Sequence, residues 1–175
     1  MEFRKYTRAT CPHNELIFVH EGSKFAILFD EDYRLCNGSI VAITEYRGSE
    51  DIEGIIFIDD TFMNLPEDVQ RLLVYHELGH WVHGEIKGAS DEWVPLDGSI
   101  SFEISKDMDE LSADRYAFEH NKSREAMAGF IGILEELRNL VINNSDKGTV
   151  EQYNAAINEL DGRIRQAHLH LEWVA

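Results

Sequence analysis

Short apolar runs separated by polar turn residues occur within the first 60 residues of the chain. Three of them cover residues 24–29, 39–44 and 54–59, and the segments between the first two are rich in Asp and Asn. Runs of this length, rich in β-branched and aromatic residues and bounded by turn residues, favour β-strands. The last run fits two alternatives, a central buried strand or an edge strand that pairs with an extended peptide.

After these runs the apolar positions recur at helical spacing, from about residue 66 to residue 83. Asn64 can cap such a helix, Pro66 suits its first turn, and Gly84 is a natural C-cap. The apolar positions are Val69, Leu72, Leu73, Leu78, Trp81 and Val82. The pattern predicts one largely buried helix.

Two longer helical patterns follow residue 122. The first runs from a Ser123 cap to about Val141, and its apolar stripe is Met127, Phe130, Ile131, Leu134, Leu137 and Val141. The second begins with the capping box Thr149-Val150-Glu151-Gln152, and its heptad positions are Val150, Tyr153, Ile157, Leu160, Ile164, Ala167 and Leu171. Such a heptad helix fits docking on the preceding helix as a hairpin, or contact of residues 149–173 with a second copy or a partner.

Strands followed by helices predict an α+β fold. The chain has 175 residues and 43% hydrophobic content, which fits one domain with a sizeable core. We therefore expect a single domain over residues 1–175. Residues 1–60 would hold mainly strands and turns, residues 64–121 the core of a functional site, and residues 123–173 a C-terminal helical hairpin.

Residues 76 to 80 read His-Glu-Leu-Gly-His, an H-E-x-x-H run inside the first predicted helix. Positions i and i+4 of a helix lie about 40° apart, so the imidazoles of His76 and His80 can reach one cation. Glu77 is turned by roughly 100° and can address a water on the metal without becoming a ligand. These residues predict most of a zinc hydrolase site. The alternative is that both histidines are ordinary core residues.

A catalytic zinc site has three protein ligands and one open position, so a third ligand is needed. A second predicted helix begins near Asp109 and places Glu110 and Asp114 on one face, with the small Ala113 and Ala117 allowing close packing on the first helix. Glu110 is the candidate ligand, and Asp114 is a candidate acceptor for the ring N–H of a zinc-bound histidine. Two alternatives stay open: Asp109 or Asp114 is the third ligand, as in aspzincins, or the acids only complement the helix dipole.

The two motifs resemble those of gluzincin-type metallopeptidases, and among them those of the minimal ImmA/IrrE-like peptidases. The resemblance covers residues 76–80 and 110–117, with weaker support from the strand-like segment before the first helix. It implies a zincin-like fold that cleaves peptide bonds, sometimes those of a DNA-binding repressor. Carried over residue by residue, it implies the zinc ligands His76, His80 and Glu110, the general base Glu77 and the supporting residue Asp114. Residues 1–50 and 123–175 lie outside the resemblance, so it does not identify the substrate.

Another zinc-hydrolase pattern fits less well. A metzincin would have Gly at position 83 and His at position 86, where this chain has His83 and Ile86. His83 lies only about 20° around the helix from His76, but one straight helix cannot supply ligands from three consecutive turns to a tetrahedral ion. His83 is then a substrate contact, a supporting residue or a surface residue.

The expected reaction is hydrolysis of a peptide bond by an activated water. Zinc would lower the pKa of its bound water towards about 7, and Glu77 would accept the proton and return it to the leaving amine. An oxyanion usually needs a further donor, and the candidates, which the sequence does not rank, are Tyr116, His120, His83, Tyr75 and Arg115.

Two other classes of protein fit the same residues. One is a catalytically silent zincin-fold protein that serves binding or assembly, and the other is a zinc hydrolase that acts on a non-peptide amide. An intact Glu77 favours an enzyme, because a structural zinc site has no use for a base beside its ligands.

The net charge of −17, from 33 acidic and 16 basic residues, argues against a direct nucleic-acid partner. It would steer a basic protein or peptide substrate, although solubility alone also accounts for it. The sequence has no 18-residue apolar stretch and no signal-peptide pattern, so we expect no membrane contact and a cytoplasmic protein. Cys11 and Cys36 lack C-x-x-C spacing and favour a reducing compartment. Cys11 could still ligate zinc as an inhibitory switch.

Overall fold

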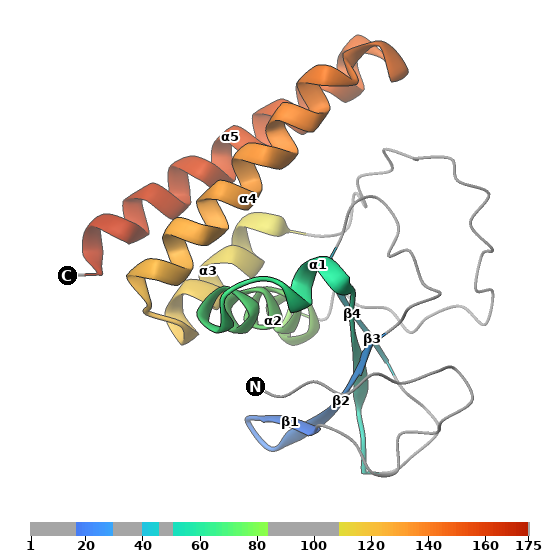
Figure 1. Ribbon diagram of the computed structural model, residues 1–175, viewed down its shortest axis with the longest axis vertical. Helices are drawn as coiled ribbons and strands as arrows, with labels where there is room; N and C mark the ends of the chain where they lie inside the picture. The colour runs from blue at the N-terminus through green and yellow to red at the C-terminus, as the bar shows by residue number, and fades with distance from the viewer. Residues whose placement is uncertain (1–16, 30–39, 46–50, 84–108, 175) are drawn as a thin grey trace. The chain divides into compact units, whose positions relative to one another are not determined.

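The computed structural model describes residues 17–29, 40–45, 51–83 and 109–174 (Figure 1). The chain divides into two compact units, residues 1–65 with 81–100 and residues 66–80 with 101–175. The first unit contains a small sheet, and the second contains most of the helical residues. The predicted α+β class is therefore confirmed, whereas a single domain over the whole chain stays a prediction.

Four strands form a mixed sheet in the order β1-β2-β4-β3. They are β1 (Ile17–His20), β2 (Ser23–Phe29), β3 (Val41–Glu45) and β4 (Gly54–Ile58). β1 is antiparallel to β2, β2 is parallel to β4, and β3 is antiparallel to β4. The three predicted strands are present with shifted ends, and β1 is a strand that we did not predict.

β4 lies between β2 and β3, and Ile56 and Ile58 in it are fully buried. Both edges of this strand are hydrogen-bonded to neighbouring strands. A strand in this position has no free edge for a peptide. The central-strand alternative is therefore confirmed, and the edge-strand alternative for residues 54–59 is wrong.

The turn between β1 and β2 consists of Glu21 and Gly22, which join the paired residues His20 and Ser23. Both turn residues have positive φ, 49° at Glu21 and 92° at Gly22. Two-residue hairpin turns of this kind favour Asn-Gly or Asp-Gly, so Glu-Gly is a weak sequence signal. The short strand before it was missed for this reason.

A single helical turn, α1 (Asp60–Met63), lies where no helix was predicted. The Asp59 side chain caps it by accepting a hydrogen bond of 2.8 Å from the Phe62 N–H. Asn64 ends this turn, because its backbone N–H donates to the Thr61 carbonyl at 3.2 Å. The prediction that Asn64 caps the next helix is therefore wrong.

The helix that carries the H-E-x-x-H run is α2 (Glu67–Val82). It begins directly after Pro66, whose carbonyl accepts from the Gln70 N–H at 3.0 Å. Glu67 and Asp68 lie in its first turn, where negative charge complements the helix dipole. The predicted helix is confirmed within a residue at each end, and the predicted C-cap Gly84 lies outside the described residues.

Two helices follow in the second unit, α3 (Glu110–His120) and α4 (Arg124–Asn143). Ser123 caps α4 as predicted and accepts a hydrogen bond of 3.1 Å from the Ala126 N–H. Buried Asn121, between the two helices, donates from its side chain to the Asp68 carbonyl at 2.8 Å. This bond ties the α3–α4 connection to the start of α2.

The last helix, α5 (Val150–Trp173), lies beside α4 and forms the predicted hairpin (Figure 1). The predicted capping box is present, with Thr149 and Gln152 exchanging hydrogen bonds of 2.9 and 3.2 Å. Val150 is 74% exposed, so the apolar contact begins after the first predicted heptad position. Among the described residues, no helix is long and apolar enough to cross a membrane.

Candidate metal centre

α2 and α3 approach each other closely at Gly79. A Cβ atom added to Gly79 would lie 2.8 Å from Cα of Ala113, which is closer than real Cβ contacts allow. Ala113 and Ala117 are both fully buried, in agreement with their expected role as small packing residues. This close approach brings His76 and His80 of α2 next to Glu110 at the start of α3.

The donor groups of these three residues approach one another closely. Nε2 of His76 is 3.2 Å from Nε2 of His80 and 3.3 Å from Oε2 of Glu110. Nε2 of His80 is 3.5 Å from Oε1 of Glu110. One ligand atom from each of the three residues lies within 4.8 Å of the other two, so the cluster can hold a metal ion.

The cluster is shielded from solvent, since His76 is 6% and His80 is 1% exposed. Their rings meet edge to face with centroids 4.8 Å apart. Buried polar groups are costly unless they are paired or coordinate a metal. Two buried imidazoles that face one carboxylate are thus a donor set with a chemical reason to bind a cation.

Asp114 lies behind His76, on the side of the ring opposite to the cluster. Its Oδ1 atom is 2.7 Å from Nδ1 of His76, and the side chain is fully buried. The contact is an ion pair when the ring is protonated. The structure thus brings Asp114 to the ring nitrogen that a metal bound at Nε2 would leave free.

Arg163 of α5 is a site residue that the sequence did not indicate. Its Nε and Nη2 atoms donate to the two carboxylate oxygens of Asp114 at 2.8 and 3.0 Å. Its Nη1 atom lies 2.7 Å from Oε2 of Glu110. The side chain is buried, and its guanidinium stands 5.8 Å from the centre of the Phe130 ring. In the sequence, the only indication of its role was a positive charge at position 163 of an amphipathic helix.

The charges of the cluster shift one another's pKa values. Burial lowers the pKa of His76, but its contacts with Asp114 and Glu110 outweigh burial and raise that pKa to about 9. Burial raises the pKa of the Glu110 carboxyl, whereas His76, His80 and Arg163 together hold it well below its usual range. The pKa of Asp114 is also lowered, because Arg163 and His76 outweigh its burial. Without a metal ion, His76 therefore carries a proton that a cation would displace.

Asp109 does not belong to the donor cluster. Its side chain caps α3 by accepting from the Ser112 N–H at 3.1 Å, and the residue is exposed. Asp114 faces Nδ1 of His76 and not the three clustered donor atoms. Glu110, and neither Asp109 nor Asp114, is therefore the carboxylate that the structure places among the three clustered donors.

Glu77 is half-buried on α2, directly after His76. His83 is exposed just beyond the end of α2, and within the described part of the chain it is not one of the donors clustered with His76. Cys11 and Cys36 lie outside the described residues.

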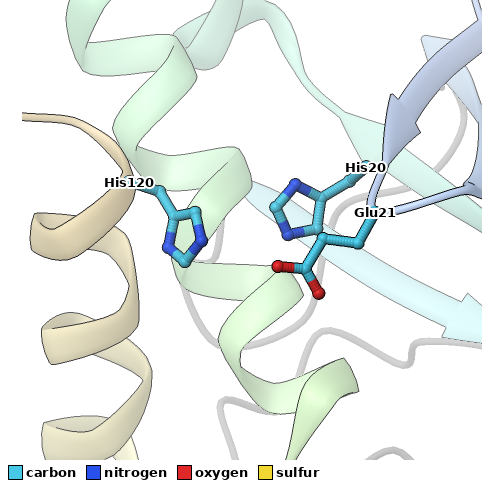
Figure 2. A group of neighbouring side chains, drawn as sticks. All are labelled: His20, Glu21 and His120. Atoms are coloured by element: carbon cyan, nitrogen blue, oxygen red, sulfur yellow. The ribbon is translucent and has the colours of Figure 1, made fainter.

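Tyr116 and His120 form an aromatic pair at the end of α3. Their rings stack with centroids 4.1 Å apart, and Tyr75 of α2 lies 5.4 Å from the His120 ring. Figure 2 shows His120 as the last residue of α3, and it also draws His20 and Glu21 at the end of β1. His20 and Glu21 belong to the other unit, so the three residues are not treated as one site.

Comparison of the chain with protein-family models, with curated proteins and with solved structures finds no match. The resemblance to gluzincins therefore rests on the motifs at residues 76–80 and 110–117.

Proposed function

We propose that this chain is a zinc-dependent endopeptidase with a zincin-like site. The observation that carries the proposal is the convergence of His76, His80 and the Glu110 carboxylate, whose closest donor atoms approach one another to 3.2 to 3.5 Å. Two imidazoles and a carboxylate that converge from two helices are the ligand types of a zinc site. The H-E-x-x-H run adds a carboxylate next to these donors, as a hydrolase requires.

His76, His80 and Glu110 would hold the ion, and Asp114 would fix the ring of His76 through its Nδ1 atom. A zinc ion bound there would supply the Lewis acidity that activates a water for attack. The three protein donors leave one position of a tetrahedral site for water or substrate. Counted over the residues that the structure describes, three donors fit a catalytic site better than a closed structural one.

Glu77 is the proposed general base. Its carboxylate accepts a proton from the attacking water and then gives it to the nitrogen of the leaving amine. Because α2 turns Glu77 away from the direction of His76 and His80, it serves the water and not the ion. The expected substrate is a protein or peptide, and the net charge of −17 would steer basic segments towards it.

The exchange of Glu77 for Gln tests this proposal, because the amide keeps the shape and removes the proton acceptor. Glu77→Gln should bind one zinc per chain and melt near the wild-type temperature. Its rate of peptide cleavage, measured on a proteome-derived peptide library, should fall by about 10² to 10⁴, towards the upper part of that range.

Glu67→Gln is the matched control, since Glu67 is an exposed residue in the first turn of the same helix. It should keep both zinc and activity. Full cleavage by zinc-loaded Glu77→Gln would exclude Glu77 as the general base. A wild-type protein that binds zinc and cleaves nothing in the library would support the catalytically silent binding protein.

A further inference from the structure

We propose that Arg163 is a positioning residue of the metal centre. The C-terminal hairpin therefore contributes a residue that the site needs for metal binding. This inference rests on the proposed metal site. It extends the site beyond residues 64–121, which the sequence indicated as its core, to a residue on α5.

The guanidinium of Arg163 connects the candidate ligand to its supporting carboxylate. Two of its nitrogens bind Asp114 in a fork, at 2.8 and 3.0 Å, and the third lies 2.7 Å from Oε2 of Glu110. Bidentate arginine pairs fix the plane of a carboxylate as well as neutralise it. Arg163 therefore holds two carboxylates at once, in the orientations in which they face His76.

Glu110 and Asp114 need such a partner because they are four residues apart on one face of α3. Like charges at this spacing repel one another, and burial strengthens the repulsion. Asp114 is fully buried and the Glu110 side chain is only 23% exposed, so water screens their repulsion incompletely. Without the guanidinium, the Glu110 side chain would turn towards solvent and leave the histidines.

The place of Arg163 is fixed by the packing of α5 on α3. One turn further along, Gln166 donates to the Leu111 carbonyl at 2.9 Å. A second turn on, the His170 ring lies 5.0 Å from the Phe118 ring. These contacts set the register of α5 over two turns, so a displacement of α5 also displaces the group that orients Glu110. Docking of α5 and binding of the ion should therefore favour each other.

A second arginine provides a matched control. Arg138 of α4 pairs with Asp161 of α5 at 2.6 Å, so it also joins α5 to a neighbouring helix. Its side chain is 37% exposed, and the pair does not include a candidate ligand. Loss of Arg138 removes one contact of the hairpin and leaves the carboxylates of the site untouched.

The test measures the zinc affinity of the full-length protein by competition with a chromophoric chelator. Arg163→Met should weaken zinc binding by about 10 to 100-fold, as the loss of groups that orient metal ligands does. Arg163→Lys keeps the positive charge but cannot donate two parallel hydrogen bonds to Asp114. Its zinc affinity should lie between those of Arg163→Met and the wild type. Arg138→Met should bind zinc as the wild type does.

Melting of the metal-free proteins and the visible spectrum of bound Co²⁺ separate positioning from general stability. Arg163→Lys should alter the Co²⁺ spectrum, which reports ligand geometry, even where its melting temperature is close to that of Arg138→Met. If Arg163→Met does not fold, the affinity and spectrum of Arg163→Lys decide.

Three results would overturn the inference while zinc binding by the wild type stands. The first is an unchanged zinc affinity in Arg163→Met, or in Arg163→Lys if Arg163→Met does not fold. The second is tighter zinc binding by Arg163→Met. The third is a loss of zinc affinity in Arg138→Met that equals the loss in Arg163→Met. A wild-type protein that binds no zinc would instead exclude the proposed metal site itself.

Discussion

Asp114 contacts two residues of the candidate centre with one carboxylate. Oδ1 lies 2.7 Å from Nδ1 of His76, and both oxygens accept hydrogen bonds from Arg163. A carboxylate behind a ligating imidazole fixes its orientation and raises its basicity. The contribution of Asp114 to metal binding should therefore be separable from that of the ligands themselves.

We expect Asp114→Asn to weaken zinc affinity by about 10 to 100-fold, whereas Glu110→Gln should abolish stoichiometric binding. Asp109→Asn is the control, because an asparagine caps a helix as well as an aspartate and Asp109 lies outside the cluster. Metal analysis and chelator competition on the purified variants provide the measurement. Retention of zinc by Glu110→Gln together with its loss from Asp109→Asn would reverse the ligand assignment.

At the scale of helices, the site depends on the separation of α2 and α3. Gly79 permits this separation, since an added Cβ would lie 2.8 Å from Cα, 3.1 Å from the carbonyl oxygen and 3.2 Å from Cβ of Ala113. Backbone atoms cannot move aside as the end of a flexible side chain can. A side chain at position 79 must therefore push α3, and Glu110 with it, away from the histidines.

Gly79→Ala should lower the free energy of unfolding by about 1 to 3 kcal/mol through overpacking, and it should also weaken zinc binding. The comparison is Gly132→Ala in α4, where an added Cβ meets nothing within 4 Å. There the higher helix propensity of alanine should raise the free energy of unfolding by up to about 1 kcal/mol. Chemical denaturation and zinc titration measure both effects. Equal effects in the two variants would show that the close approach at Gly79 is unimportant.

At the scale of the whole molecule, the buried charges make the stability of the metal-free protein depend on pH. The pKa of His76 is raised from 6.5 to about 9 on folding. Its contribution to stability is thus complete below pH 6.5 and is lost as the pH rises through about 9. The lowered pKa values of Glu110 and Asp114 act in the opposite sense, and their contributions are lost as the pH falls below their ordinary values of 4.5 and 3.8.

The melting temperature of the metal-free protein should therefore fall between pH 6.5 and pH 9. His76→Gln, which cannot titrate at this position, should show a smaller fall, and calorimetry in the presence of a chelator measures both. The zinc-loaded wild type should lack this contribution, because a ligating His76 is neutral across the range. Parallel curves for the metal-free wild type and His76→Gln would contradict the assigned role of this imidazole.

The pattern of single elements was predictable because it depends on residues close in the chain. The Ser123 cap, the capping box at Thr149 and the apolar stripe of α4 each involve neighbours within a few positions. Strand β1 and the turn α1 were missed, since one relies on an atypical Glu-Gly turn and the other is a single turn. Asn64 was assigned to the wrong helix because a residue between two helices can end one or begin the other.

The sequence by itself determined that His76 and His80 face one direction, because a helix fixes the relation between positions i and i+4. It also pointed to Glu110 through the spacing of a second acidic helix. Only the tertiary structure decided that β4 is central, that Gly79 meets Ala113, and that Arg163 joins Asp114 across 49 positions of the chain. The physical reason is that a buried charge is stabilised by partners on other elements, and packing alone determines which elements meet.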